Sequence, residues 1–214
     1  MTSRPGSVFS SDTDALTALM KLYAPLSECP RILDCAYSKG TMWRGVPEHR
    51  TDILVRSDLA PHPQLDLRCD YLHLPFVSAF DVIVWDPPHI ADAGKESVIG
   101  KRFGSVKLDW LYFREFAQQA YHALKPRGLL LAKITDGIHG QKYRDHMIQM
   151  WGALKGGFDR RYIAVLLSPQ NKITDPKWKH VENPRIEHVY WVAATKKKEK
   201  PHARRSKRTR GAAS

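Results

Sequence analysis

The sequence has few cysteines, and it has no hydrophobic run long enough to cross a membrane. The three cysteines, Cys29, Cys35 and Cys69, stand apart without a C-x-x-C pair, which argues against a structural zinc site and a disulfide framework. The histidines form no H-E-x-x-H motif, so we expect no metal. No apolar run approaches the roughly 20 residues that a membrane-spanning helix needs. Residues 1–11 lack the basic and then apolar layout of a signal peptide, so we expect a cytoplasmic protein.

Acidic residues are scarce relative to basic ones, and the imbalance is concentrated at one end of the chain. The 214 residues include 34 Lys and Arg against 22 Asp and Glu, a net charge of +12. Nine basic residues and one acidic residue lie between Lys196 and Arg210, which is two thirds of that net charge. We expect residues 1–195 to form one domain and residues 196–214 to be a disordered tail that binds phosphates. A solubilising tail would have the same composition, so the charge alone only favours nucleic acid as a partner.

Short apolar runs that alternate with helical patterns predict an α/β fold around a mostly parallel sheet. Helices are predicted over residues 12–24, 108–124 and 141–154. Runs such as 81–85 and 129–134 are mostly apolar, as expected of parallel strands that are covered on both faces. The seven predicted strands span residues 31–35, 52–56, 67–69, 81–85, 129–134, 162–167 and 189–193.

Four aspartates, Asp34, Asp58, Asp70 and Asp86, come at or just after the ends of the first four predicted strands. In open α/β sheets, ligands bind beyond the carboxyl ends of the strands. Any one of these aspartates could be a helix cap or a turn residue. The ordered set of four is harder to explain in that way, and it predicts a ligand site at this edge of the sheet.

The residues Asp86, Pro87, Pro88 and His89 come directly after one of the buried strands. Because proline has no backbone N–H, the two prolines give a stiff loop that offers only hydrogen-bond acceptors. Such a surface suits an amino group, whose two hydrogens both need partners. The tetrapeptide could be an ordinary turn, but its position after a continuous apolar strand favours a functional role.

This motif resembles the signature of the S-adenosylmethionine-dependent amino-methyltransferases of nucleobases: Asp, Asn or Ser, then two prolines, then an aromatic residue. The resemblance extends over residues 30–195 and implies a Rossmann-like α/β fold. That fold has a seven-stranded, mostly parallel sheet with an antiparallel C-terminal strand and helices on both faces. The resemblance also implies that Asp86 and the carbonyl of Pro87 orient the target amine, that Pro88 holds the loop, and that His89 stacks on a flipped base. Histidine is a less usual occupant of the last position than tyrosine, phenylalanine or tryptophan.

The stretch from Leu33 to Thr41 resembles the cofactor loop of the same superfamily, Leu-Asp-x-x-x-Gly-x-Gly-Thr, in which small residues let the backbone approach the ligand. Asp58 matches the acidic residue that accepts the ribose hydroxyls, and Asp70 the one that receives the adenine amino group. Ser38 and Lys39 stand where a glycine and a small residue are usual, which leaves weakened or lost cofactor binding open. The implied S-adenosylmethionine site comprises Asp34, Ala36, Tyr37, Gly40, Asp58, Asp70 and Tyr71.

Two further segments, residues 91–104 and 169–185, combine basic residues with glycines or aromatics. We expect both to contact nucleic acid through phosphates and stacked bases, although solvated surface loops would have a similar composition. Neither is long enough for a separate target-recognition domain, so specificity should be short or loose, or supplied by a partner subunit or a second copy. The predicted contact residues are Lys95, Lys101, Arg102, Lys177, Trp178 and Arg185.

Three functions remain open. The first is methylation of adenine N6 in DNA, because the motif begins with aspartate and residues such as His139–Gln141 resemble small phage and prophage DNA methyltransferases. The second is methylation of an RNA base, for instance guanine N2 of ribosomal RNA. The third is a catalytically silent nucleic-acid-binding protein, a possibility that Ser38 and Lys39 in the cofactor loop suggest. A nicotinamide dehydrogenase is disfavoured because no G-x-G-x-x-G comes after the first predicted strand.

Overall fold

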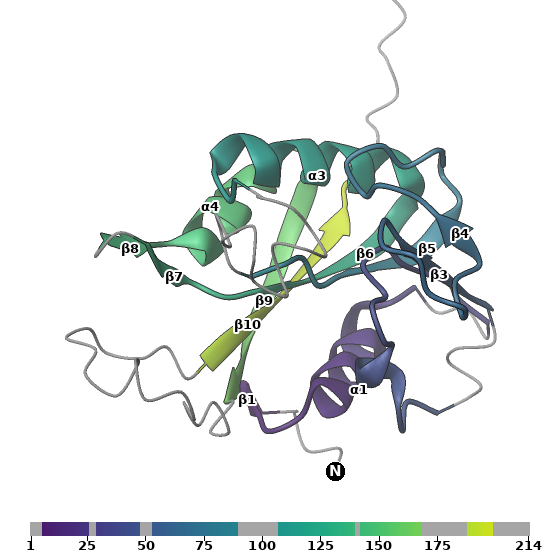
Figure 1. Ribbon diagram of the computed structural model, residues 1–214, viewed down its shortest axis with the longest axis horizontal. Coiled ribbons are helices and arrows are strands. Elements are labelled where there is room, and N and C mark those ends of the chain that lie inside the picture. The colour runs from purple at the N-terminus through teal and green to yellow at the C-terminus, as the bar shows by residue number, and fades with distance from the viewer. Residues whose placement is uncertain are drawn as a thin grey trace, which may run out of the picture.

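A computed structural model describes most of the chain as one layer of β-structure between two layers of helices (Figure 1). The described residues are 6–25, 29–47, 53–89, 107–139, 142–167 and 188–198. The strands are β1 (Val8–Phe9), β2 (Arg31–Asp34), β3 (Ile53–Asp58), β4 (Leu67–Arg68), β5 (Phe80–Trp85), β6 (Leu124–Ile134), β7 (Gly137–His139), β8 (Lys142–Arg144), β9 (Phe158–Leu167) and β10 (His188–Lys196). The helices are α1 (Asp12–Tyr23), α3 (Trp110–Ala123), α4 (His146–Ala153) and the short 3₁₀-helix η1 (Thr41–Trp43).

The main sheet has the topology that the sequence predicts, with one strand more at its edge. Within the described residues it holds eight strands in the order β1-β9-β10-β6-β5-β2-β3-β4. The last strand, β10, is antiparallel to both of its neighbours, and all the other neighbouring pairs are parallel. The mostly parallel sheet with an antiparallel C-terminal strand is therefore confirmed. The prediction of seven strands missed β1, because a strand of two residues is too short to show any periodicity.

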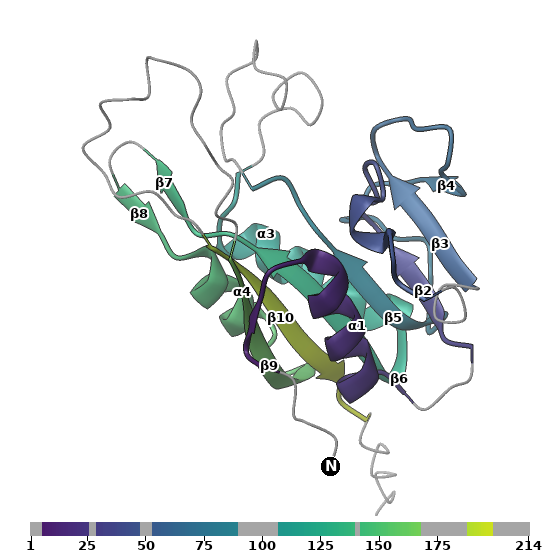
Figure 2. The same cartoon turned by 90° about the horizontal axis from the view of Figure 1, so that it is seen from below.

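Helices cover both faces of the sheet, which explains why its central strands are mostly apolar. Figure 2 shows α1 across one face, with α3 and α4 behind the sheet. On β5, Val82 and Val84 face the α1 layer, whereas Ile83 and Trp85 face the α3 layer. The ring of Trp85 stacks on Phe116 of α3 with 3.6 Å between ring centroids. Every residue of β5 is therefore buried, although successive side chains point in opposite directions.

Side-chain hydrogen bonds cap the N-termini of α1 and α3, as is usual at helix ends. The Ser11 side chain accepts a hydrogen bond from the backbone N–H of Asp14, and Asp109 does the same for Tyr112. At its other end, α3 passes directly into β6 at Leu124. The predicted helix over 108–124 is thus observed with slightly shorter bounds. Within the described residues, none of the helices combines the length and the apolar composition required to cross a membrane.

The predicted helix over 141–154 is wrong in its first part. Residues 142–144 form strand β8, which pairs with β7 in a hairpin, and the helix begins only at His146. The side chain of Asp136 explains the difference, because it accepts hydrogen bonds from the Tyr143 hydroxyl and from the backbone N–H of Met147. These two contacts hold the chain in the hairpin before α4 starts. The hairpin projects from the same end of the sheet as the loop after β5 (Figure 2).

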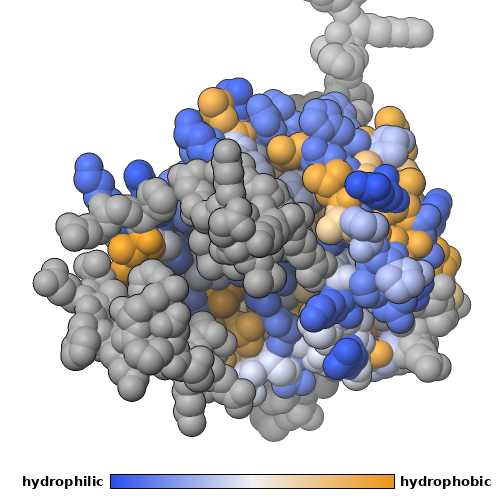
Figure 3. All heavy atoms as spheres, viewed as in Figure 1, coloured by the Kyte–Doolittle hydropathy of each residue, from blue (hydrophilic) through white to orange (hydrophobic). Residues whose placement is uncertain are grey.

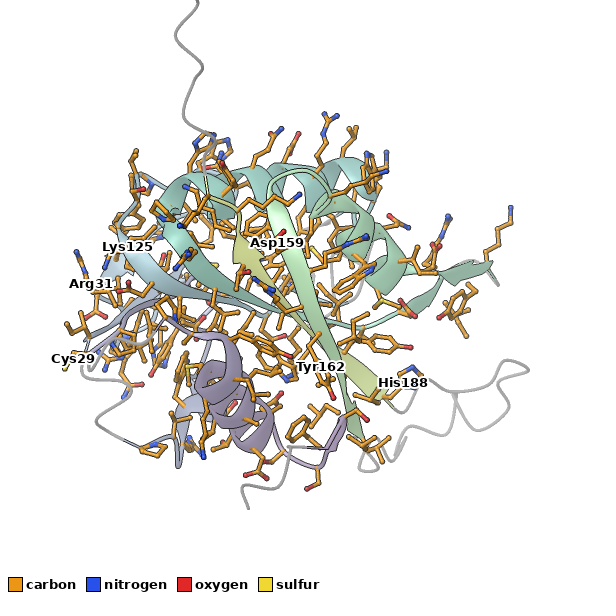
Figure 4. All side chains as sticks on the ribbon, turned by 180° about the vertical axis from the view of Figure 1, so that it is seen from behind. Cys29, Arg31, Lys125, Asp159, Tyr162 and His188 are labelled. Atoms are coloured by element: carbon orange, nitrogen blue, oxygen red, sulfur yellow. The ribbon has the colours of Figure 1, made fainter. Side chains whose placement is uncertain are left out.

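The opposite end of the sheet is fastened by a buried carboxylate. Asp81, at the start of β5, accepts a hydrogen bond from the backbone N–H of Arg31 at 2.9 Å and from Lys125 Nζ at 2.8 Å. Figure 4 shows Arg31 and Lys125 near each other at this end, far from His188 at the start of β10. These two hydrogen bonds hold the amino ends of β2, β5 and β6 together. They lie at the end of the sheet opposite to the carboxyl ends of the parallel strands.

Candidate functional site

A cavity of about 700 Å³ lies at the carboxyl ends of β2, β3, β4 and β5. Four loops line it: residues 36–39, 58–59, 70–72 and 86–89. Nine of the eleven residues predicted for catalysis or cofactor binding reach its surface, namely Ala36, Tyr37, Asp58, Asp70, Tyr71, Asp86, Pro87, Pro88 and His89. Asp34 and Gly40 do not, and both lie behind the loop that they shape. The fold thus collects the predicted motifs around one cavity, as expected for a sheet whose parallel strands end together.

Asp34 supports the first loop from below instead of facing the cavity. Its carboxylate is fully buried and accepts hydrogen bonds from Trp43 Nε1 at 2.6 Å and from the backbone N–H of Ala36 at 3.1 Å. Burial raises the pKa of Asp34 to about 7, although these two hydrogen bonds act in the opposite direction. The side chain therefore ties the end of β2 to η1 and sets the course of residues 35–43.

The loop after β2 also accommodates the residue that departs from the family pattern. Ser38 adopts a φ of +52°, in the left-handed region that glycine favours. Its backbone N–H donates a 2.8 Å hydrogen bond to Asp58 Oδ2, which holds that conformation. Gly40, two residues later, has a φ of +61°. Ser38 thus takes a backbone conformation that glycine favours, at the position where the resemblance implies a glycine, and Lys39 beside it is exposed.

Asp58 and Asp70 each hold their own loop and still face the cavity. Asp58 Oδ1 accepts from the backbone N–H of Ala60 at 2.9 Å, and Asp70 Oδ1 accepts from that of Leu72 at 2.8 Å. A carboxylate offers about four acceptor positions, so each of them retains capacity for a ligand hydroxyl or amino group. Leu59, which is 51% exposed, adds an uncovered apolar surface next to Asp58.

Asp86 lies at the centre of a chain of charged groups. Its Oδ1 is 2.9 Å from His89 Nε2, and its Oδ2 is 3.3 Å from Lys133 Nζ. Lys133 Nζ is also 2.9 Å from Asp12 Oδ2, and Asp12 Oδ1 accepts a hydrogen bond from Trp191 Nε1 at 3.0 Å. Burial by itself would raise the pKa of Asp86, but the hydrogen bond from His89 and the charge of Lys133 outweigh it, so that the pKa lies below its ordinary value. The carboxylate therefore stays ionised at neutral pH.

Lys133 is a site residue that the sequence reasoning missed. It lies on β6 one position after Ala132, which pairs with Trp85, so the register places it beside Asp86. Burial lowers the pKa of Lys133, but the negative charges of Asp86 and Asp12 outweigh it and raise the pKa above its ordinary value. The available signal was a single charged residue inside the otherwise apolar predicted strand 129–134. Its partner Asp12 is 121 residues away, so only the fold reveals the pair.

Replacing Lys133 by methionine is expected to raise the pKa of Asp86, because the charge that offsets its burial is lost. The folded-state pKa of Asp86 lies below its unfolded value, so its stabilising contribution is present above the unfolded pKa and is lost as the pH falls through the folded one. In Lys133→Met this contribution weakens, and we expect the free energy of unfolding at pH 7 to fall by about 2 kcal/mol. A carbon-13 NMR titration of the carboxyl group, together with denaturant unfolding, measures both effects.

The matched control is Asp12→Asn, which removes the other partner of Lys133 and leaves its contact with Asp86 in place. The pKa of Asp86 should not rise in this variant. An equal rise in both variants, or no rise in either, would contradict the role given to Lys133.

The residues predicted to contact nucleic acid lie outside the described residues. This applies to all six of them: Lys95, Lys101, Arg102, Lys177, Trp178 and Arg185. They remain predictions.

The order of the strands and the place of the cavity define the class of fold. A parallel sheet with an antiparallel last strand between β9 and β6, helices on both faces and a cavity at the carboxyl ends of β2 and β3 is the Rossmann-like fold of the S-adenosylmethionine-dependent methyltransferases. No protein-family model matches the sequence, and neither does any curated protein. The likeness of this chain to known proteins therefore rests on the comparison with solved structures.

Several solved structures share this fold at low sequence identity. TrmN from Thermus thermophilus has a TM-score of 0.50 and 17% identity over 86% of this chain, which spans only 48% of the TrmN chain. The 1,6-didemethyltoxoflavin-N1-methyltransferase of Burkholderia thailandensis, solved with S-adenosylhomocysteine, has a TM-score of 0.52 and 12% identity over 88% of this chain and 80% of its own. The [4+2]-cyclase SpnF has a TM-score of 0.51 and 15% identity over 86% of this chain and 80% of its own. Because a cyclase is among them, the fold alone does not fix the reaction.

Proposed function

We propose that this chain is an S-adenosylmethionine-dependent methyltransferase that acts on an exocyclic amino group of a nucleobase, with adenine N6 in DNA as the first candidate. One observation carries the proposal: the Asp86–His89 loop lines the same cavity as residues 36–39, Asp58 and Asp70. A proline-flanked acceptor loop thus opens into the space where an adenosine-containing cofactor would fit.

The residues around the cavity suit S-adenosylmethionine. Asp58 and Asp70 offer free acceptor positions for the ribose hydroxyls and for the adenine amino group, and Leu59 offers an apolar surface for the adenine ring. The bend at Ser38 and Gly40 turns the backbone around the cavity without filling it. When bound, this cofactor supplies an electrophilic methyl group on a sulfonium. A retained cavity and a supported loop favour the enzyme over the catalytically silent alternative.

The second half of the cavity suits an amino group as the acceptor of the methyl group. Neither Pro87 nor Pro88 has a backbone N–H, so the loop presents carbonyls and the Asp86 carboxylate, all of which accept hydrogen bonds. Two acceptors orient an NH2 group and draw its lone pair away from the ring. As the nitrogen bonds to the methyl carbon, the bond from that carbon to the cofactor's sulfur would break and the nitrogen would gain positive charge, which an ionised Asp86 would stabilise through a preorganised contact. The surplus proton of the amine would then leave to the solvent. Because its pKa is lowered, Asp86 acts by its charge and not as a strong base.

His89 fits the role of a stacking residue despite its contact with Asp86. Its Nε2 lies on the edge of the ring, so the 2.9 Å contact with Asp86 Oδ1 leaves the faces of the imidazole free. A base held by Asp86 could therefore lie against one face. The contact also limits the rotation of His89, which keeps the ring in position before a base arrives.

The first test is whether the protein binds S-adenosylmethionine and transfers its methyl group. We expect calorimetric titration to detect a single cofactor site, and tritiated cofactor to label DNA containing adenine. Mass spectrometry of the nucleosides should then identify N6-methyladenosine in its deoxy form. Labelling of RNA with N2-methylguanosine would select the second candidate instead. Absence of cofactor binding would leave the catalytically silent protein as the answer.

A further inference from the structure

A second hollow lies between α3 and α4, on the face of the sheet opposite to α1. Its volume is about 460 Å³, and aromatic and basic side chains line it, among them Trp110, Arg114, Tyr121 and Lys155. We refer to it as the α3–α4 groove. None of the described residues that line it is acidic. Along α3, at the top of Figure 3, hydrophilic and hydrophobic residues alternate on the described surface.

Two glycines make the room for the aromatic walls of this groove. A Cβ at Gly152 would lie 2.8 Å from Cζ3 of Trp110, and one at Gly157 would lie 3.0 Å from Cδ2 of Tyr121. Larger residues at these positions would push the rings out of place. The groove therefore has a shape that depends on particular small residues.

The exposed surface of Trp110 needs an explanation. It is 44% exposed, although tryptophan is usually mostly buried. Arg114 lies one helical turn later and is exposed, and Lys155 is exposed as well. An aromatic face with two cations and no acidic neighbour among the groove's described lining residues complements a ligand that has flat rings and negative charges. Lys196 Nζ lies 4.3 Å from the centroid of the Tyr121 ring, which adds positive charge at this wall of the groove.

The groove and the cavity that holds the Asp86–His89 loop have neighbouring lining residues at the start of α3. Asp109 and Leu111 line that cavity, whereas Trp110 between them lines the groove. A ligand that extends from the cavity over the first turn of α3 would thus reach Trp110 directly. Next to Gly152 in the sequence, Trp151 has Arg160 over its ring, with the Arg160 Cζ 5.0 Å from the centroid.

We propose that the α3–α4 groove binds an unpaired flank of the nucleic-acid substrate, with a base on Trp110 and phosphates at Arg114 and Lys155. This inference rests on the proposed function, because it assumes a nucleic-acid substrate. Stacking on an exposed aromatic ring and contact with basic side chains is how proteins hold single strands without reading sequence. The groove therefore supplies affinity beside the cavity, and the base in the cavity supplies the chemistry.

The test measures the binding of a fluorescein-labelled single-stranded DNA of about 20 nucleotides by anisotropy over a range of KCl concentrations. Trp110→Ala should raise the Kd about tenfold, because one stacking contact is lost. Trp110→Leu, which keeps an apolar side chain against Gly152, should raise it similarly and separates stacking from folding. Arg114→Ala/Lys155→Ala should reduce the slope of log K against log[salt] by about 1.4, since each phosphate contact contributes about 0.7.

The control is Lys21→Ala/Arg127→Ala, which removes the same charge from the end of α1 and from the first part of β6. It should leave the salt slope unchanged. If the groove variants bind the DNA like this control while the wild-type protein still transfers methyl groups, the groove inference alone is wrong. If the wild-type protein neither binds the DNA nor methylates any nucleic acid, the proposed function is wrong as well. Calorimetry with S-adenosylmethionine should give equal affinities for all of these variants.

Discussion

Replacing Asp86 by alanine is expected to lower kcat for methyl transfer by at least about 10³-fold, while cofactor binding and the fold are kept. The variant loses both the negative charge and the acceptor oxygens that orient the amine. Lys133 keeps its second partner, Asp12, at 2.9 Å, so no unpaired cation is left behind. The loss should appear in kcat more than in KM, because the interaction with Asp86 strengthens as charge develops on the nitrogen.

Asp86→Asn separates the two contributions of this side chain. An asparagine keeps one carbonyl acceptor but has no negative charge. If charge stabilisation dominates, the Asn variant should be nearly as slow as the Ala variant; if orientation dominates, it should stay much closer to the wild-type rate. Asp159→Asn is the matched control, because Asp159 lies on β9 with a side chain that is 50% exposed (Figure 4). Full activity in Asp86→Ala would remove Asp86 from the mechanism, and a loss in Asp159→Asn would point to a general effect of charge.

The motifs at the strand ends could be predicted from the sequence because their cause is local. A continuous apolar run such as Val82–Trp85 is typical of a covered parallel strand, and the residues directly after such a strand lie at the carboxyl edge of the sheet. The same reasoning predicts that Asp58 and Asp70 lie at the same edge as Asp86. Their position around one cavity is a consequence of the topology.

The part that could not be predicted depends on contacts between distant segments. The chain of contacts from Asp12 through Lys133 to Asp86 joins α1, β6 and the end of β5, and no spacing in the sequence indicates it. The sequence predicts that Asp34 touches the cofactor, but its carboxylate is turned beneath the loop by Trp43. Hydrogen-bond partners such as Trp43 decide whether a carboxylate at a strand end faces the cavity, and a sequence pattern does not show these partners.

Replacing Gly40 by alanine is expected to impair both stability and cofactor binding, because the added methyl group would collide with the ring of Tyr37. Gly40 has a φ of +61°, which costs a residue with a Cβ about 1 kcal/mol. In addition, its Cβ would collide with Cζ and with the hydroxyl oxygen of Tyr37. Tyr37 is 8% exposed, and Arg56 Cζ lies 5.9 Å from the centroid of its ring, so the ring has little freedom to withdraw except toward the cavity. We expect the free energy of unfolding to fall by about 3 kcal/mol and the Kd for S-adenosylmethionine to rise at least about tenfold.

Gly45→Ala distinguishes this clash from backbone strain. Gly45 has a φ of +88°, but the nearest atom to its Cβ would be Thr13 Cγ2 at an ordinary 3.7 Å. It should therefore lose only about 1 kcal/mol. The double variant Tyr37→Ala/Gly40→Ala should be less destabilised than the sum of its single changes, because the ring that collides is gone. Thermal and denaturant unfolding measure these energies. Equal losses in Gly40→Ala and Gly45→Ala would mean that the loop yields easily, and that Tyr37 does not hold the shape of the cofactor loop.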